Sequence, residues 1–169
     1  MMWRFFPTLD PQVELVMSRD LDSRLTAREA AAVGEWLESN KTLHVMRDHP
    51  WHGVPIMGGG WDSRLDTEVR RKHWRNSWSR MLGDKQVFTD SKGKGADQDL
   101  LSRHVWRVWA RDDSVQHDSY TCARFPGSVG WPTQRLNTTD HNFFGAVGPV
   151  EFMQVCPVQC RRQQDWKYC

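Results

Sequence analysis

The fold is decided by residues 13–24, VELVMSRDLDSR. The run opens with mostly apolar residues and a β-branched bias, which predicts a strand buried in a sheet. Asp20 and Asp22 follow it, with one residue between them. Ligands of open α/β sheets bind at the carboxyl ends of the strands, so these carboxylates are expected at a ligand-binding edge. Oxygen ligands of this kind suit Mg²⁺ or Mn²⁺, with a substrate phosphate completing the coordination. A solvated turn is the alternative interpretation.

The segment after the aspartates predicts a βαβ unit. Thr26 and Glu29 fit a capping box at the start of a helix. Apolar residues then recur at helical spacing as far as Leu37, and residues 42–46 predict a second strand. The order strand, helix, strand favours parallel strands in an α/β fold, with the aspartates at the ligand edge.

Composition narrows the possible partners. The chain of 169 residues is long enough for one domain with one core, and its net charge of +2 is too small to argue for nucleic acid. No apolar run is long enough to span a bilayer. The first seven residues are too short and too mixed for a signal peptide.

The cysteines all lie in the C-terminal third of the chain, at Cys122, Cys156, Cys160 and Cys169. Their even number predicts two disulfides that fix a tail, and therefore an oxidising compartment. Zinc is the weaker alternative, because only one closely spaced cysteine pair is present. Glycosylation sequons at Asn40 and Asn137 agree with a lumenal (Golgi) or secreted location, although this chain carries no signal or anchor.

Two later segments contain candidate site residues. Residues 50–61 are expected to be a loop, in which Gly58, Gly59 and Gly60 either let the backbone approach a ligand or form a turn. A helix is predicted over residues 67–82 and another from residue 96 to residue 108. Asp97 and Asp99 at the start of the second helix are explained by the helix dipole, or by a role as acceptor ligand or catalytic base. The remainder is expected to be loop-rich, with a short strand or turn at residues 115–120.

Several of these segments together resemble glycosyltransferases of the GT-A fold. The segments that carry the resemblance are residues 20–22, 44–50, 58–61 and 96–101, and it continues through residues 117–120, residues 132–135 and the cysteine tail. The resemblance implies a partial GT-A-like, Rossmann-like mixed sheet flanked by helices over residues 1–155. A cysteine-rich tail would follow at residues 156–169.

The resemblance also implies a set of site residues. It implies a nucleotide-sugar donor, a carbohydrate acceptor and a divalent cation, Mn²⁺ or Mg²⁺. Asp20 and Asp22 would hold the cation with His117 as a third ligand, and Arg19 would contact the cofactor. Asp97 and Asp99 would contact the acceptor or assist its deprotonation. The substrate-binding residues would be Gly58, Gly59, Gly60, Trp61 and Gln98, with Trp61 stacked on a sugar face.

The chain departs from this pattern at its start. GT-A enzymes place a nucleotide-binding half before the aspartate motif, and here only twelve residues precede residue 13. The expected function is therefore a fragment of a glycosyltransferase that an upstream half completes, transferring a sugar to a glycan or other hydroxyl acceptor. The alternative is an inactive carbohydrate-binding or structural domain, which the ten tryptophans also suit.

Overall fold

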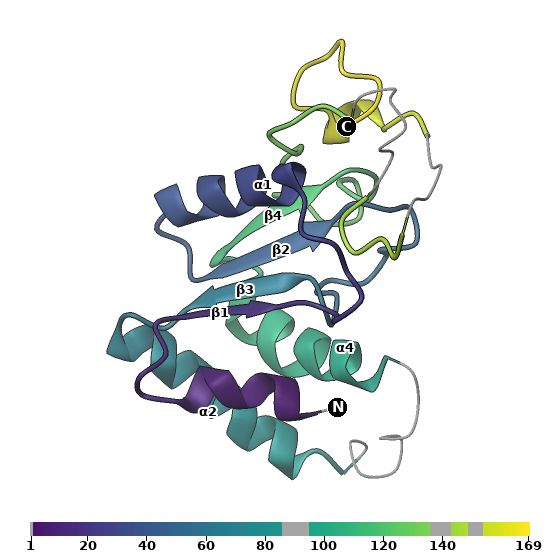
Figure 1. Ribbon diagram of the computed structural model, residues 1–169. Coiled ribbons are helices and arrows are strands. Elements are labelled where there is room, and N and C mark those ends of the chain that lie inside the picture. Colours follow the sequence, from purple (N-terminus) through teal and green to yellow (C-terminus); the bar gives the residue numbers. More distant parts are fainter. Residues whose placement is uncertain (1, 86–94, 136–142, 149–153) are drawn as a thin grey trace.

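A computed structural model describes residues 2–85, 95–135, 143–148 and 154–169. Its centre is a four-stranded sheet in the order β1 (Leu15–Ser18), β3 (Trp61–Arg64), β2 (Leu43–Arg47) and β4 (Ser114–Asp118) (Figure 1). β3 is antiparallel to both β1 and β2, while β4 is parallel to β2. β1 and β2 therefore run in the same direction on either side of β3. The predicted mixed α/β sheet is confirmed.

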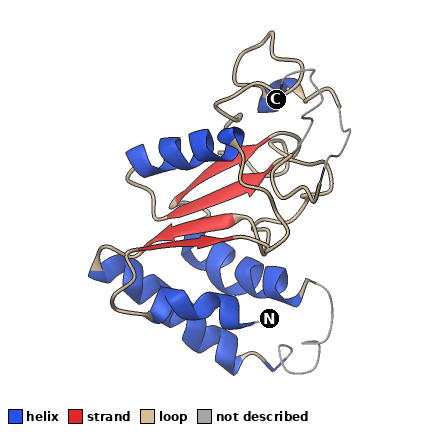
Figure 2. Ribbon diagram, viewed as in Figure 1, coloured by secondary structure: helices blue, strands red, loops and turns tan. Residues whose placement is uncertain are grey.

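Helices cover both faces of the sheet (Figure 2). α1 (Ala27–Glu38) connects β1 to β2 and lies on one face, where Trp36 stacks on His44. The other face carries η1 (Met2–Leu9), α2 (Glu68–Gly83) and α4 (Ala96–Leu101), and α4 continues into the π-helical η2 (Ser102–Ala110). The predicted cap of the first helix is confirmed, because the Thr26 side chain accepts a hydrogen bond from the Glu29 amide at 3.1 Å.

β1 differs from the strand that the sequence predicts. Its burial alternates: Val16 and Ser18 are buried, but Leu15 and Met17 are 45% and 49% exposed. The expectation of a strand buried in the sheet is wrong for these two side chains. The reason is that β3 lies between β1 and β2, which makes β1 an edge strand, whereas the contacts of α1 are to the His44 and Met46 side of β2.

The main core fills the space between the sheet and the helices of η1, α2, α4 and η2. Trp61 and Trp74 stack in it with ring centroids 5.0 Å apart, and Leu43 and Val45 of β2 are fully buried beside them. β2 is buried at all five positions because helices cover both of its faces. This arrangement makes the carboxyl end of β2 a rigid point from which the next loop starts.

The C-terminal tail is held by the two disulfides that the sequence predicts. Cys122 bonds Cys160 at the end of η3 (Val158–Cys160), and Cys156 bonds Cys169. Such bonds persist in oxidising compartments, so they are compatible with a secreted or lumenal protein. Of the two sequons, Asn40 is exposed, with its side-chain oxygen accepting a hydrogen bond from Arg70 at 3.0 Å. Asn137 lies outside the described residues.

Among the helices of the described residues, none has both the length and the apolar character needed to cross a membrane.

Candidate functional site

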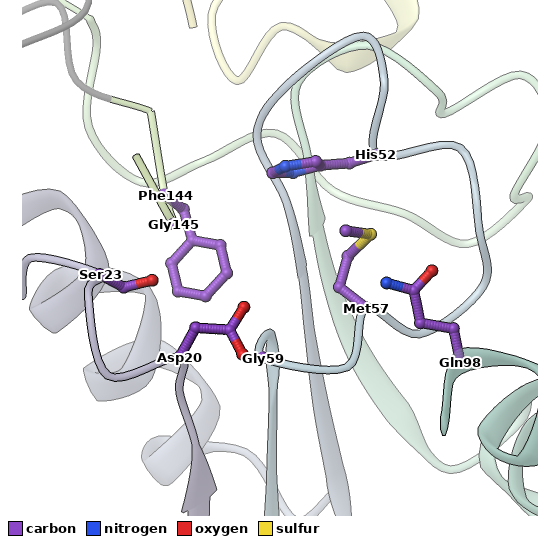
Figure 3. Close-up of a pocket in the computed structure, with 8 residues that line it drawn as sticks. All are labelled: Asp20, Ser23, His52, Met57, Gly59, Gln98, Phe144 and Gly145. Carbon is purple, nitrogen blue, oxygen red and sulfur yellow. The ribbon is translucent and has the colours of Figure 1, made fainter. Parts of the chain in front are cut away.

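A pocket opens at the carboxyl ends of β1 and β2 (Figure 3). It is small, with room of about 70 Å³, and is partly open to solvent. The loop after β1, the loop after β2, the start of α4 and the segment 143–148 all contribute to its wall. The lining residues are Asp20, Ser23, His52, Met57, Gly59, Gln98, Phe144 and Gly145. Three of the residues predicted from the sequence, Asp20, Gly59 and Gln98, are thus brought together from distant segments.

Asp20 lies against a glycine backbone. Its carboxylate is so close to Gly59 that a Cβ there would lie 2.7 Å from the Asp20 Cγ atom, and any side chain would displace it. Ser18, at the end of β1, donates a hydrogen bond to the Gly58 carbonyl at 2.9 Å and fixes the two loops to each other. The Asp20 side chain remains 56% exposed toward the pocket. Gly58 to Gly60 thus form the turn that was the alternative interpretation, closed by a hydrogen bond from the Gly60 amide to the Met57 carbonyl at 3.1 Å, and the group close to Gly59 is the Asp20 carboxylate.

Arg4 joins Asp20 to the second predicted carboxylate. Its guanidinium lies 3.3 Å from Asp20 Oδ1 and 3.2 Å from Asp97 Oδ2. A Cβ on Gly58 would lie 2.5 Å from the same Asp97 oxygen, so a side chain there would have to displace Asp97. The two carboxylates and one guanidinium leave a formal charge of −1 at this side of the pocket.

Asp22 and Asp99 lie outside the pocket wall. Both side chains are exposed, Asp22 on the turn after β1 and Asp99 in the first turn of α4. Asp22 is two residues from Asp20, and the turn that separates them is closed by a hydrogen bond from the Ser23 amide to the Asp20 carbonyl at 3.1 Å.

Gly60 and Trp61 belong to the core side of the same loop. A Cβ on Gly60 would lie 2.9 Å from the Phe144 ring, so Gly60 supports a lining residue from beneath. Trp61 begins β3, its side chain is fully buried, and its ring stacks on Trp74. A residue that stacks on a sugar needs an exposed ring face, and in this structure Trp61 has none.

Arg19 points away from the pocket into a buried chain of polar side chains. Its guanidinium pairs with Glu29 and donates to Asp62 Oδ1 at 2.6 Å. The other Asp62 oxygen bonds His44 Nδ1 at 2.7 Å, and His44 Nε2 bonds His117 Nδ1 at 2.8 Å. The chain crosses the sheet beneath α1, and a cofactor contact by Arg19 would require it to leave two buried carboxylates.

His117 lies at the far end of this chain. Its Nε2 atom bonds Glu35 at 3.2 Å, so both ring nitrogens already have protein partners. Burial is the main reason why the pKa of His117 falls to about 4, and the nearby His44 lowers it further. The structure does not bring His117 into the pocket with Asp20.

His52 is the imidazole that the structure does place at the pocket. It follows β2 by five residues, and the same sheet-edge argument that singled out Asp20 would have reached it. No sequence pattern indicated Arg4 or Phe144 as site residues, because they come from segments far from the predicted strand ends.

A second group of possible metal ligands contains Asp118, Cys122 and Cys160. The two sulfurs are bonded to each other in a disulfide, and Asp118 accepts hydrogen bonds from Arg47 at 2.7 Å and from the Thr121 hydroxyl at 2.6 Å. A thiol must be deprotonated and free to bind a metal, so this cluster has a structural role.

The residues at the pocket supply some, but not all, of the ligands that a divalent cation takes. Asp20 offers an exposed carboxylate held against Gly59, whereas the exposed carboxylate of Asp22, on the same turn, lies outside the pocket wall. Mg²⁺ and related ions are often held by one or two carboxylates, with waters and substrate phosphates completing the shell. His117 does not belong to this set.

Comparison with known proteins finds no family model, no curated protein and no solved structure that matches this chain. No comparison therefore supports the resemblance to GT-A glycosyltransferases, which stays a prediction from the sequence.

Proposed function

We propose that this chain is part of a metal-dependent glycosyltransferase of the GT-A type. It would transfer a sugar from a nucleoside-diphosphate donor to a hydroxyl group of a glycan or other acceptor. The observation that carries the proposal is the convergence of Asp20, Gly59 and Gln98 on one pocket at the carboxyl end of β1. Open α/β sheets bind their ligands at this edge.

The residues around the pocket would have different roles in such a reaction. Asp20, with Asp22 beside it, would hold Mn²⁺ or Mg²⁺. A divalent cation neutralises the charge that develops on a departing diphosphate. Gln98, at the start of α4, would contact the acceptor, while Asp97 next to it is only 5% exposed and pairs with Arg4. Arg4 pairs with both Asp20 and Asp97 and so connects the turn after β1 to the start of α4.

A carbohydrate-binding domain without transferase activity is the second candidate, and the size of the pocket favours it. Its room of about 70 Å³ lies well below the range for ligand pockets, roughly 300–1,000 Å³. The pocket therefore suits one sugar unit better than a complete nucleotide sugar.

Metal dependence separates the two candidates. The test is calorimetric titration of the chain with pyrophosphate, UDP-glucose and GDP-mannose, in Mn²⁺ and again in EDTA, followed by a donor-hydrolysis assay. We expect Mn²⁺-dependent binding that Asp20→Ala weakens at least about tenfold, the loss that one removed charge-assisted contact produces. Asp112→Ala is the matched control, because Asp112 is an 82% exposed aspartate that pairs only with its neighbour Arg111 among the described residues.

The opposite result has a clear form. Binding of free monosaccharides in EDTA that survives the double change Asp20→Ala and Asp22→Ala would overturn the transferase proposal in favour of the carbohydrate-binding domain.

A further inference from the structure

His52 stands on the pocket wall across from Asp20, and Figure 3 shows its ring reaching over the hollow. The ring is oriented by the backbone beneath it. The Asp48 amide donates to His52 Nδ1 at 3.1 Å, and the His52 amide donates to the His49 carbonyl at 2.8 Å. The orientation of the imidazole is thereby fixed from the protein side.

The residue beneath His52 is itself immobilised. The Asp48 carboxylate is fully buried and accepts hydrogen bonds from Arg28 at 2.9 Å and from Arg135 at 2.6 Å. The His52 ring is therefore attached to one of the most rigid points of the fold.

The hydrogen bond to Nδ1 determines the tautomer of the ring. A neutral imidazole has one N–H and one lone pair, and here the lone pair of Nδ1 accepts the Asp48 amide. The proton must then lie on Nε2. Burial lowers the pKa of His52 to about 4; the charge of Asp48 opposes this shift, and His49 and Arg135 add to it. The ring is consequently neutral at pH 7.

We propose that His52 presents a fixed, neutral Nε2–H donor to the pocket and selects ligands that place an oxygen acceptor opposite it. An Nε2 atom that carries a proton has no lone pair to offer, so His52 is neither a metal ligand nor a general base. The identity of the ligand as a sugar unit rests on the proposed function.

The other lining groups match this chemistry. Asp20, Ser23 and Gln98 offer oxygen and amide groups, while Phe144 and Met57 supply apolar surface between them. Polar groups around an apolar patch suit a hydroxylated ring, which has oxygen atoms at its edge and C–H groups on its faces. The hydroxyl or ring oxygen that faces His52 would accept its hydrogen bond.

Two substitutions separate the functions of the two ring nitrogens. In His52→Asn the amide oxygen can still accept the Asp48 amide, but nothing replaces the Nε2 donor. In His52→Gln the longer side chain can supply a donor near the Nε2 position, but the acceptor for Asp48 is lost. His73→Asn is the control, because His73 lies on α2, where its ring stacks on Trp109.

The first measurement needs no ligand. Long-range ¹H–¹⁵N correlation spectra of the ¹⁵N-histidine-labelled chain, assigned by comparison with His52→Asn, report the tautomer directly. We expect a neutral Nε2–H ring from pH 8 down to pH 5.5. An Nδ1–H tautomer, or a charged ring at pH 7, would overturn the inference about His52, whatever the protein binds.

The second measurement uses glucose, galactose, mannose and N-acetylglucosamine as probes in calorimetric titrations. We expect His52→Asn to lower the affinity for the bound sugar about tenfold, with unchanged unfolding temperature, since one hydrogen bond is lost. His52→Gln is expected to retain more affinity but to unfold earlier. Equal affinity of His52→Asn and wild type would overturn the inference. If the wild-type chain binds none of these sugars and none of the nucleotide probes, yet the tautomer is as expected, the proposed function fails while the assignment of His52 stands.

Discussion

Asp20 and Asp48 occupy matching places in the fold and have opposite surroundings. Each follows one of the two strands β1 and β2, which run in the same direction, so both leave the sheet at the same edge. Asp48 is fully buried and bonds Arg28, Arg135, the Ser119 hydroxyl and the Phe144 amide. Asp20 is 56% exposed, and its ion pair is with Arg4 at 3.3 Å.

The difference comes from what covers each strand end. α1 and the C-terminal segments reach the end of β2, where Arg28 and Arg135 surround Asp48. The end of β1 is at the edge strand of the sheet, and there the carboxylate faces the pocket. Burial raises the pKa of the Asp48 carboxyl, but the two arginines outweigh this effect and hold that pKa below its ordinary value. Two carboxylates at the same edge of the sheet thus differ in exposure because different segments cover them.

The largest effect is expected for Asp48→Asn. The change leaves Arg28 and Arg135 close together without the charge that compensates them, which typically costs about 4 kcal/mol of unfolding free energy. Urea denaturation followed by tryptophan fluorescence measures the loss. Asp112→Asn is the exposed control, and a stability of Asp48→Asn equal to that control would contradict the structural role.

Removal of the second disulfide should act on the same cluster at somewhat lower cost. The Cys169 carbonyl accepts a hydrogen bond from Arg135 at 3.2 Å, so the tail helps to hold the partner of Asp48. The double change Cys156→Ser and Cys169→Ser opens a loop with a sequence separation of 13 and should cost about 3 kcal/mol. Thermal unfolding of the double variant checks this. If its unfolding temperature matched that of the wild type, the tail would be independent of the Asp48 cluster.

Acid should weaken the fold before any carboxylate titrates. The pKa values of His52 and His117 are lowered by burial from 6.5 to about 4, so between these pH values the unfolded chain takes up protons that the folded chain does not. The unfolding free energy must therefore fall as the pH falls, by about 2 kcal/mol from pH 7 to pH 5 for each of the two histidines.

Urea denaturation at pH 7, 6 and 5 gives the slope. His52→Asn should flatten it, because one of the two groups is removed. A flat profile for the wild type would show that neither imidazole is kept neutral by the fold.

The smallest effect on stability is expected for Asp20→Asn. An ion pair with one half-exposed partner contributes no more than about 0.5 kcal/mol, so the variant should fold almost as well as the wild type. The same denaturation measurement used for Asp48→Asn places both residues on one scale. A loss above about 2 kcal/mol would remove the contrast between the two aspartates and make Asp20 a structural residue as well.

Local sequence patterns predicted the elements that depend on short-range interactions. The apolar, β-branched run before Asp20 and the capping residues of α1 indicated β1 and α1, and the even number of clustered cysteines indicated the disulfide-bonded tail. β3 was not predicted, because Asp62, Ser63 and Arg64 have no strand-like pattern. They form a buried strand only where His44 and Trp74 supply their hydrogen bonds.

The candidate site also combines residues that local sequence patterns indicated with residues that only the tertiary fold brings there. Asp20, Gly59 and Gln98 were found from their types and local positions, whereas Arg4, His52 and Phe144 joined them only through folding. Trp61 and His117 have the right chemistry for a site, but their side chains face the interior.

The sequence by itself determined the strand before Asp20, the helix that follows it and the presence of two disulfides in the tail, whereas which cysteines pair was decided by the structure. These depend on hydrogen bonds and apolar periodicity within a few residues, or on a count of reactive groups. Tertiary structure alone decided which aspartate is buried and which imidazole reaches the pocket. Burial and ion pairing depend on side chains far apart in the sequence, such as Arg135 beside Asp48 and Arg4 beside Asp20, and no local pattern encodes those contacts.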